Sequence, residues 1–151
     1  TCDACGTYEG TVSSDGDSVT FLPVAGQGLD DEPLEPTPFS AQVTENSNSS
    51  DSLDMVVTLE LEISGITANV PVELTVSYDE ATDEFTAIPN QNVSLQADVP
   101  GVGVIPVDVK LVDFSGTVDG TDVNGSITVD DQDGSGNDNY DATLTFSGTA
   151  Q

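Results

Sequence analysis

Apolar and polar residues alternate along almost the whole of this 151-residue chain, and no segment shows a helical period. The clearest stretch is 53–63, where every second residue is apolar. After a short turn the alternation resumes over 70–78. Such alternation is typical of strands that bury one face and expose the other. The pattern therefore predicts an all-β protein in which these two stretches form an antiparallel hairpin.

Shorter alternating stretches bring the expected total to about nine to eleven strands joined by hairpin-length loops. Within 104–118 the alternation slips by one residue at Val112, which is typical of a β-bulge. Residues 25–38, rich in proline, glycine and acids, are expected to form the longest irregular loop. We therefore predict an antiparallel meander closed as a β-barrel, with a two-sheet β-sandwich as the alternative.

We expect residues 1–5 to form an N-terminal tail and residues 6–151 to form a single β domain. The opening 6–11, the amphipathic strands and the ending 144–148 resemble the calycin-like, lipocalin-type barrels of secreted bacterial proteins. The Gly-x-Trp signature of lipocalins is missing, because Tyr8 stands in that strand and the chain has no Trp. The resemblance implies an antiparallel barrel with a cavity for an apolar ligand.

The charge of the chain is extreme, with 28 acidic residues against one basic residue, Lys110, and a net charge of -27. Binding to phosphates relies on Arg and Lys, so nucleic acids are excluded as partners. An anionic membrane surface would repel this protein for the same reason. No apolar stretch approaches the ~18 residues that a spanning helix needs, so we expect no membrane insertion.

The composition also argues against an enzyme. The chain has no His, which excludes a Ser-His-Asp triad, a Cys-His pair and imidazole metal ligands. A pair of carboxylates of the glycosidase type is the one catalytic chemistry left open. Because so many acids will give some suitably spaced pair by chance, we predict a non-catalytic protein.

Both cysteines, Cys2 and Cys5, lie in the tail. They would supply only two zinc ligands, and no βαβ pattern of a redox domain surrounds them. We predict a disulfide, either within the chain or between subunits, formed in an oxidising compartment. No signal-peptide pattern follows Thr1, so we expect that any such peptide has been removed. The expected location is therefore secreted or at the cell surface.

One acidic loop resembles the first half of an EF-hand calcium site. Its candidate ligands are Asp131, Asp133, Ser135, Asn137 and Asp141. Oxygen ligands at alternate positions followed by a glycine let the backbone turn around the ion. The loop departs from the family in having no Glu at its last position and in being flanked by strands. Calcium is therefore a candidate cofactor, and a solvated hairpin loop is the alternative.

Two other acidic runs, 15–17 and 30–32, are weaker candidates for calcium. Three Asn-x-Ser sequons mark glycosylation candidates at Asn48, Asn92 and Asn124.

These observations together favour a structural subunit of an extracellular assembly such as a filament, sheath or surface layer. Its expected partners are copies of itself or other surface proteins, together with divalent cations. The acidity fits either halophilic adaptation or a calcium-rich matrix. The alternatives are a secreted calycin-like module for a small apolar ligand and a glycan-binding adhesin module.

The net charge leads to a first prediction. Two like charges at ~4 Å repel by about 1 kcal/mol in water, and salt screens this repulsion. The melting temperature should therefore rise with sodium chloride, and should rise more in calcium chloride of equal ionic strength, because calcium can also be chelated. Calorimetric melting in both salts measures this, and equal melting temperatures at low and high salt would contradict it.

Overall fold

The computed structural model describes residues 2–24, 27–48, 51–63, 66–132 and 140–151. These residues form eleven antiparallel strands and no helix, which confirms the predicted all-β class and strand number. The strands are β1 (Gly6–Ser13), β2 (Ser18–Val24), β3 (Gln27–Pro33), β4 (Thr37–Glu45), β5 (Ser52–Ile63), β6 (Ile66–Asp79), β7 (Glu84–Thr86), β8 (Gln91–Val99), β9 (Gly103–Val118), β10 (Asp122–Asp131) and β11 (Tyr140–Ala150).

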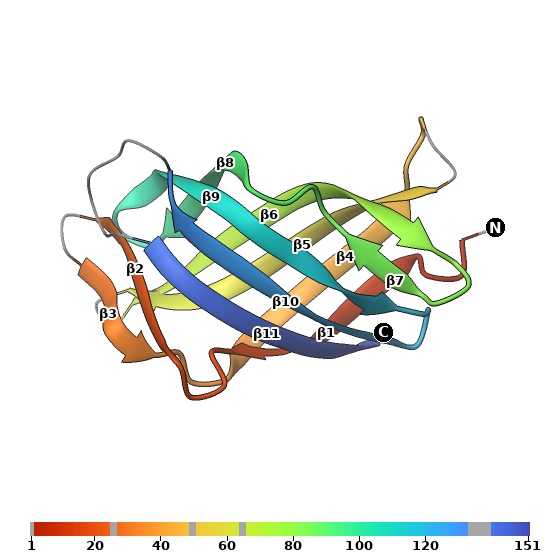
Figure 1. The fold of residues 1–151 in the computed structure, drawn as a ribbon. Helices are drawn as coiled ribbons and strands as arrows, with labels where there is room; N and C mark the ends of the chain where they lie inside the picture. Colours follow the sequence, from red (N-terminus) through yellow and green to blue (C-terminus); the bar gives the residue numbers. More distant parts are fainter. Residues whose placement is uncertain (1, 25–26, 49–50, 64–65, 133–139) are drawn as a thin grey trace.

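The strands close into an eight-stranded barrel, as predicted, rather than a two-sheet sandwich (Figure 1). The eleven strands fill eight positions in the barrel, because three positions each hold two consecutive strands. These pairs are β1 with β2, β3 with β4, and β7 with β8. β1 and β2 both pair with β11, β7 and β8 both pair with β9, and β3 and β4 pair with β2 and β1. The chain therefore runs up and down around the barrel in sequence order.

Pairing between the first and last strands closes the barrel. β1 and β11 are in antiparallel register from Tyr8–Ala150 to Ser13–Thr145. Because a closed barrel has few unpaired edges, this contact protects the sheet from edge-to-edge aggregation.

The predicted bulge in β9 is confirmed. Along the β9–β10 ladder Thr128 lies opposite Asp113, whereas the next residue, Val129, lies opposite Leu111. Val112 is thus the extra residue. Phe114 and Leu111, on either side of it, are both buried. The bulge therefore keeps both halves of this long strand facing the core.

The expectation of one irregular loop over 25–38 was wrong. Residues Gln27–Pro33 form β3, which pairs with β2, and Thr37 begins β4. β3 contains three consecutive acids, so its sequence does not alternate. Backbone pairing with β2 makes it a strand, and side-chain patterning gives no sign of it.

The inward residues of each strand form one continuous apolar core. Eight of the ten alternate residues of the 53–61 and 70–78 stretches are buried. The other two, Leu74 and Tyr78, are half-buried. Four phenylalanines form a row through this core, with ring centroids 5.3–5.8 Å apart from one to the next. They are Phe39, Phe146, Phe114 and Phe85.

Glycines make room for this aromatic row. Gly10 lies opposite Phe39, and Gly125 lies opposite Phe146. A Cβ at Gly125 would lie 2.7 Å from the Phe146 ring, and one at Gly10 would overlap the Ser147 carbonyl oxygen. The strands therefore approach more closely here than any side chain would allow.

Gly10→Ala should lower the free energy of unfolding by ~3 kcal/mol, because a rigid backbone carbonyl occupies the site of the new methyl group. Ser147→Ala is the matched control, since this side chain is exposed on the facing strand. It should cost less than about 0.5 kcal/mol. Urea denaturation measures both changes, and equal losses would contradict the proposed close approach.

Candidate functional site

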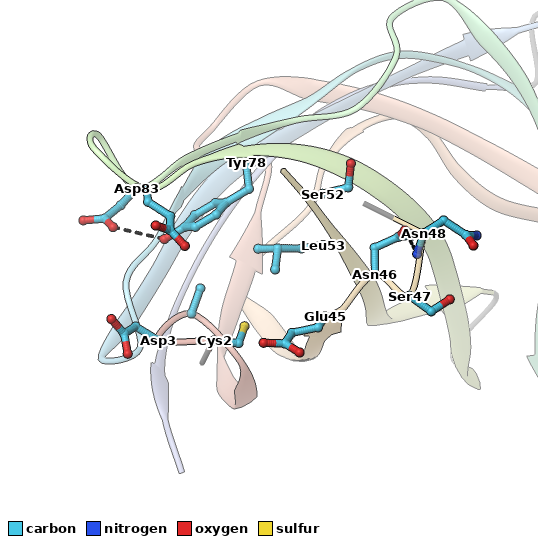
Figure 2. A pocket seen from close by; sticks show the side chains of 12 residues that line it. Cys2, Asp3, Glu45, Asn46, Ser47, Asn48, Ser52, Leu53, Tyr78 and Asp83 are labelled. Carbon is cyan, nitrogen blue, oxygen red and sulfur yellow. Dashed lines mark hydrogen bonds between the residues drawn. The ribbon is translucent and has the colours of Figure 1, made fainter. Parts of the chain in front are cut away.

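The two ends of the barrel differ in character. One end of the barrel carries both chain termini, and we call it the tail end (Figure 1). The strands β2, β5, β8 and β10 end at the opposite end, which we call the loop end. A groove with a volume of about 710 Å³ lies at the tail end. Its walls come from the tail, the β4–β5 turn and the β6–β7 turn (Figure 2).

The lining of the tail-end groove is rich in oxygen. Its carboxylates are Asp3, Glu45, Glu80 and Asp83, and its neutral polar side chains are Asn46, Ser47, Asn48, Ser52 and Tyr78. Carboxylate, amide and hydroxyl oxygens are ligands for hard cations such as calcium. The arrangement therefore suits binding of cations or of cationic groups.

Tyr78 reaches across to the β6–β7 turn within this groove. Its hydroxyl lies 3.0 Å from Asp83 Oδ1 and 3.1 Å from the Val118 carbonyl oxygen, and it donates its single proton to one of them (Figure 2). Burial, with a smaller contribution from the Asp83 carboxylate, raises the pKa of Tyr78 to about 12. This phenol therefore stays neutral and holds the turn beside the groove.

The tail is anchored to its own barrel. The Tyr8 hydroxyl, buried in the core, donates a hydrogen bond of 2.7 Å to the Ala4 carbonyl, and Ala4 is itself buried. Cys2 and Cys5 form a disulfide within the chain, so the internal form of the predicted bond is confirmed. A Cβ at Gly120 would overlap the Asp3 carbonyl oxygen, so the tail also lies directly on the β9–β10 turn.

Acidic residues surround this anchor point. Burial is the main cause that raises the pKa of Tyr8, and the negative charges of Asp119 and Asp122 add to it. Asp119 itself accepts backbone N–H bonds of 2.8 Å from Asp122 and Thr121, which lower the pKa of its carboxyl. The tail end thus carries negative charge on the β9–β10 turn as well as in the groove.

The candidate calcium loop lies at the other end of the barrel. Asp133, Ser135 and Asn137 are outside the described residues. The β10–β11 ladder places Asp130, rather than Asp131, opposite the exposed Asp141. Because neighbouring strand residues point to opposite faces, Asp131 and Asp141 lie on different faces of the sheet. The calcium loop stays a prediction.

The weaker acidic runs occupy a turn and a strand. Residues 15–17 form the β1–β2 turn, and 30–32 lie within β3. In the described part of the chain, no three carboxylate or thiol groups lie close enough together to hold a metal ion.

All three sequon asparagines are exposed. Asn48 lines the tail-end groove, Asn92 lies on β8 opposite Lys110, and Asn124 lies on β10. Each side chain therefore lies on the surface, and glycosylation stays a prediction.

A small cavity lies among the described residues inside the barrel. The interior cavity of about 30 Å³ is lined by apolar residues including Phe21, Leu29, Leu61 and Val129. This volume is room for about one water molecule. Ligand pockets usually measure roughly 300–1,000 Å³, so an apolar ligand would have to displace these side chains.

Comparison with known proteins gives no relative from which a function could be inferred. No family model, curated protein or solved structure matches it significantly. Among the residues that the structure describes, no helix is long and apolar enough to span a membrane.

The tail-end groove was not among the predicted sites. Its walls come from segments that are about twenty-five to forty residues apart in the chain, and only the folded barrel brings them together. The one signal in the sequence is that acids accumulate in the turns, as at 79–84. The anchoring of Ala4 left no signal in the sequence, because the group that accepts the Tyr8 hydrogen bond is a backbone carbonyl, which every residue has.

Tyrosine titration tests these surroundings. The chain has three tyrosines and no Trp, and the pKa of each tyrosine is raised, that of Tyr78 to about 12. The absorbance of the native protein at 295 nm should therefore rise above pH 10. Its last phase, near pH 12, should be absent in Tyr78→Phe and present in Tyr140→Phe.

The free energy of unfolding should change over the same range. The stability that the neutral Tyr78 contributes is complete below the pKa of the unfolded state, about 10, and is lost between pH 10 and 12. Ionisation of all three native tyrosines near pH 10 would contradict this.

Proposed function

We propose that this chain is a non-catalytic structural subunit of an extracellular assembly, in which divalent cations bridge the acidic surfaces of neighbouring subunits. The observation that carries the proposal is the tail-end groove, where carboxylates from three segments line one surface at the end of a closed barrel. The sheet underneath supports each of these segments, so the groove presents its oxygens from a well-packed scaffold.

Charge decides how such subunits could meet. Each copy carries a net charge of -27, so two bare copies repel each other. Calcium takes roughly six to eight oxygen ligands and would both screen this repulsion and link the surfaces. The groove supplies part of such a ligand set, and we propose that a second subunit supplies the rest.

Two further features support a role outside the cell and outside catalysis. The Cys2–Cys5 disulfide is a bond that persists in oxidising compartments. The core is filled by apolar side chains, and the polar chemistry lies on the outer faces and in the turns. Surface contacts rather than an internal site are therefore the natural use of this barrel.

A calycin-like binding module is the second candidate. The eight-stranded antiparallel barrel is compatible with that family, and the apolar lining at the loop end is the observation that favours it. Here a small apolar ligand would enter beside Phe21 and Leu29 and displace them. Saturable binding of a fluorescent fatty acid by a protein that stays monomeric in calcium would favour this candidate over the assembly.

Sedimentation and negative-stain electron microscopy test the assembly directly. Calcium chloride should produce polymers that sodium chloride of equal ionic strength does not. Asp3→Asn with Glu80→Gln, two exposed groove residues, should weaken polymer formation severalfold. The control Asp98→Asn with Asp108→Asn removes the same charge from exposed positions outside the groove and should polymerise normally. Monomers under every condition, or equal effects of both double variants, would contradict the proposal.

A further inference from the structure

One side of the barrel wall carries polar side chains with almost no charge. It is the outer face of β9, β10, β11 and β1, which are neighbours in the sheet. Three of these strands, β9, β10 and β11, run side by side at the front of Figure 1. Because alternate residues of a strand point outward, the ladders between these strands show which outward side chains are adjacent.

Serine and threonine form a continuous row across this face. Each residue of the row lies opposite the next one in the neighbouring strand, from β6 through β7, β9, β10 and β11 to β1. The members are Ser77, Thr86, Ser115, Ser126, Thr145 and Ser13. The row therefore presents a hydroxyl group on each of six adjacent strands.

A second row lies beside the first, two residues further along each strand. It consists of Thr117, Asn124, Ser147 and Thr11 on β9, β10, β11 and β1. All four side chains of this row are exposed. We call the eight residues that the two rows place on β9, β10, β11 and β1 the hydroxyl face.

The charge pattern separates the hydroxyl face from its surroundings. The chain has 28 acidic residues, yet all eight side chains of this face are neutral. Acidic residues on the same four strands and on β7 form a border around it. They are Glu9, Glu84, Asp113, Asp122, Asp130 and Asp141. The hydroxyl face is therefore a neutral area within an acidic surface.

Hydroxyl groups can pair with one another, whereas carboxylates can only accept hydrogen bonds. Beside the face, the hydroxyl oxygens of Thr128 and Thr143 lie 3.3 Å apart and share one hydrogen bond. The same pairing can form between two copies of the face, and a two-fold dimer requires such a self-complementary surface. Serine and threonine are also small, so two faces can approach as packed sheets do, at ~10 Å.

We propose that the hydroxyl face packs against the hydroxyl face of a second copy of this chain. The contact goes beyond the calcium-bridged groove, because it lies on the barrel wall and needs no cation. Hydrogen bonds between hydroxyl groups set the register of the two copies. The methyl groups of Thr11, Thr117 and Thr145 add apolar contact area.

Charge favours a second copy over other partners. A basic partner gains nothing from a neutral area when the rest of the surface is acidic. A polyanion meets the acidic border and gains no hydrogen bond to a basic group. Two copies of this chain repel each other wherever their acids meet, and the hydroxyl face is a surface on which close approach brings no two carboxylates together.

Sedimentation equilibrium of the full chain in sodium chloride with EDTA tests the proposal, because EDTA removes the contribution of calcium. Dimers should form with rising protein concentration at 1 M salt, where a screening length of ~3 Å suppresses repulsion between the acidic borders. Thr117→Asp with Thr145→Asp should weaken dimerisation at least about tenfold, because each copy then buries two carboxylates without partners. The control Ser94→Asp with Gln96→Asp adds the same charge at exposed positions of β8 and should dimerise normally.

Monomers of the unaltered protein at every salt concentration would overturn the proposal, and so would equal effects of the two double variants. Amide chemical shifts of the unaltered protein on dilution give a test that needs no variant. The changes should concentrate on β9, β10, β11 and β1, and changes centred on other strands would also overturn the proposal. So would a monomer that binds a neutral glucan through this face. Dimers that persist in EDTA while calcium produces no polymers would contradict the calcium-bridged groove alone.

Discussion

Closure of the sheet by β1 and β11 is the contact on which the rest of this structure depends. A chain with a net charge of -27 needs a large dry core to outweigh the repulsion among its carboxylates. The closed barrel puts one face of every strand into that core and leaves the other face to the charges. The glycines opposite Phe39 and Phe146 then allow the strands to approach closely enough for the aromatic row to form.

Features that depend on local alternation could be predicted from the sequence. The β5–β6 hairpin, the bulge at Val112 and the closed antiparallel barrel all follow from which residues are apolar and where the phase slips. Long strands with one buried face leave few other solutions. At three barrel positions a short interruption divides the chain into two consecutive strands. The sequence does not distinguish such an interruption from a hairpin turn, because both are short polar segments between alternating stretches.

Features held by backbone contacts could not be predicted. β3 is a strand through pairing with β2 despite its run of acids, and Ala4 joins the core through the Tyr8 hydroxyl bond. The surface features at the two ends of the barrel are of this kind. The tail-end groove combines segments distant in sequence, and the unpaired edge of β5 exists because β4 stops pairing at Leu59. In each case the polar groups lie outside the apolar core, which is why the function we propose is one of surface contacts.

Residue-resolved amide hydrogen exchange on the native protein tests this account most directly. The closed part of the wall predicts slow exchange along Leu53–Leu59, where β5 has a partner strand on both sides. Alternate amides of Glu60–Ile63 should exchange much faster, because among the described residues no strand pairs with this edge of β5 beyond Leu59, while the amides bonded to β6 stay protected. Uniform slow exchange through Ile63 would show that β5 is paired on both sides along its whole length and would contradict the account.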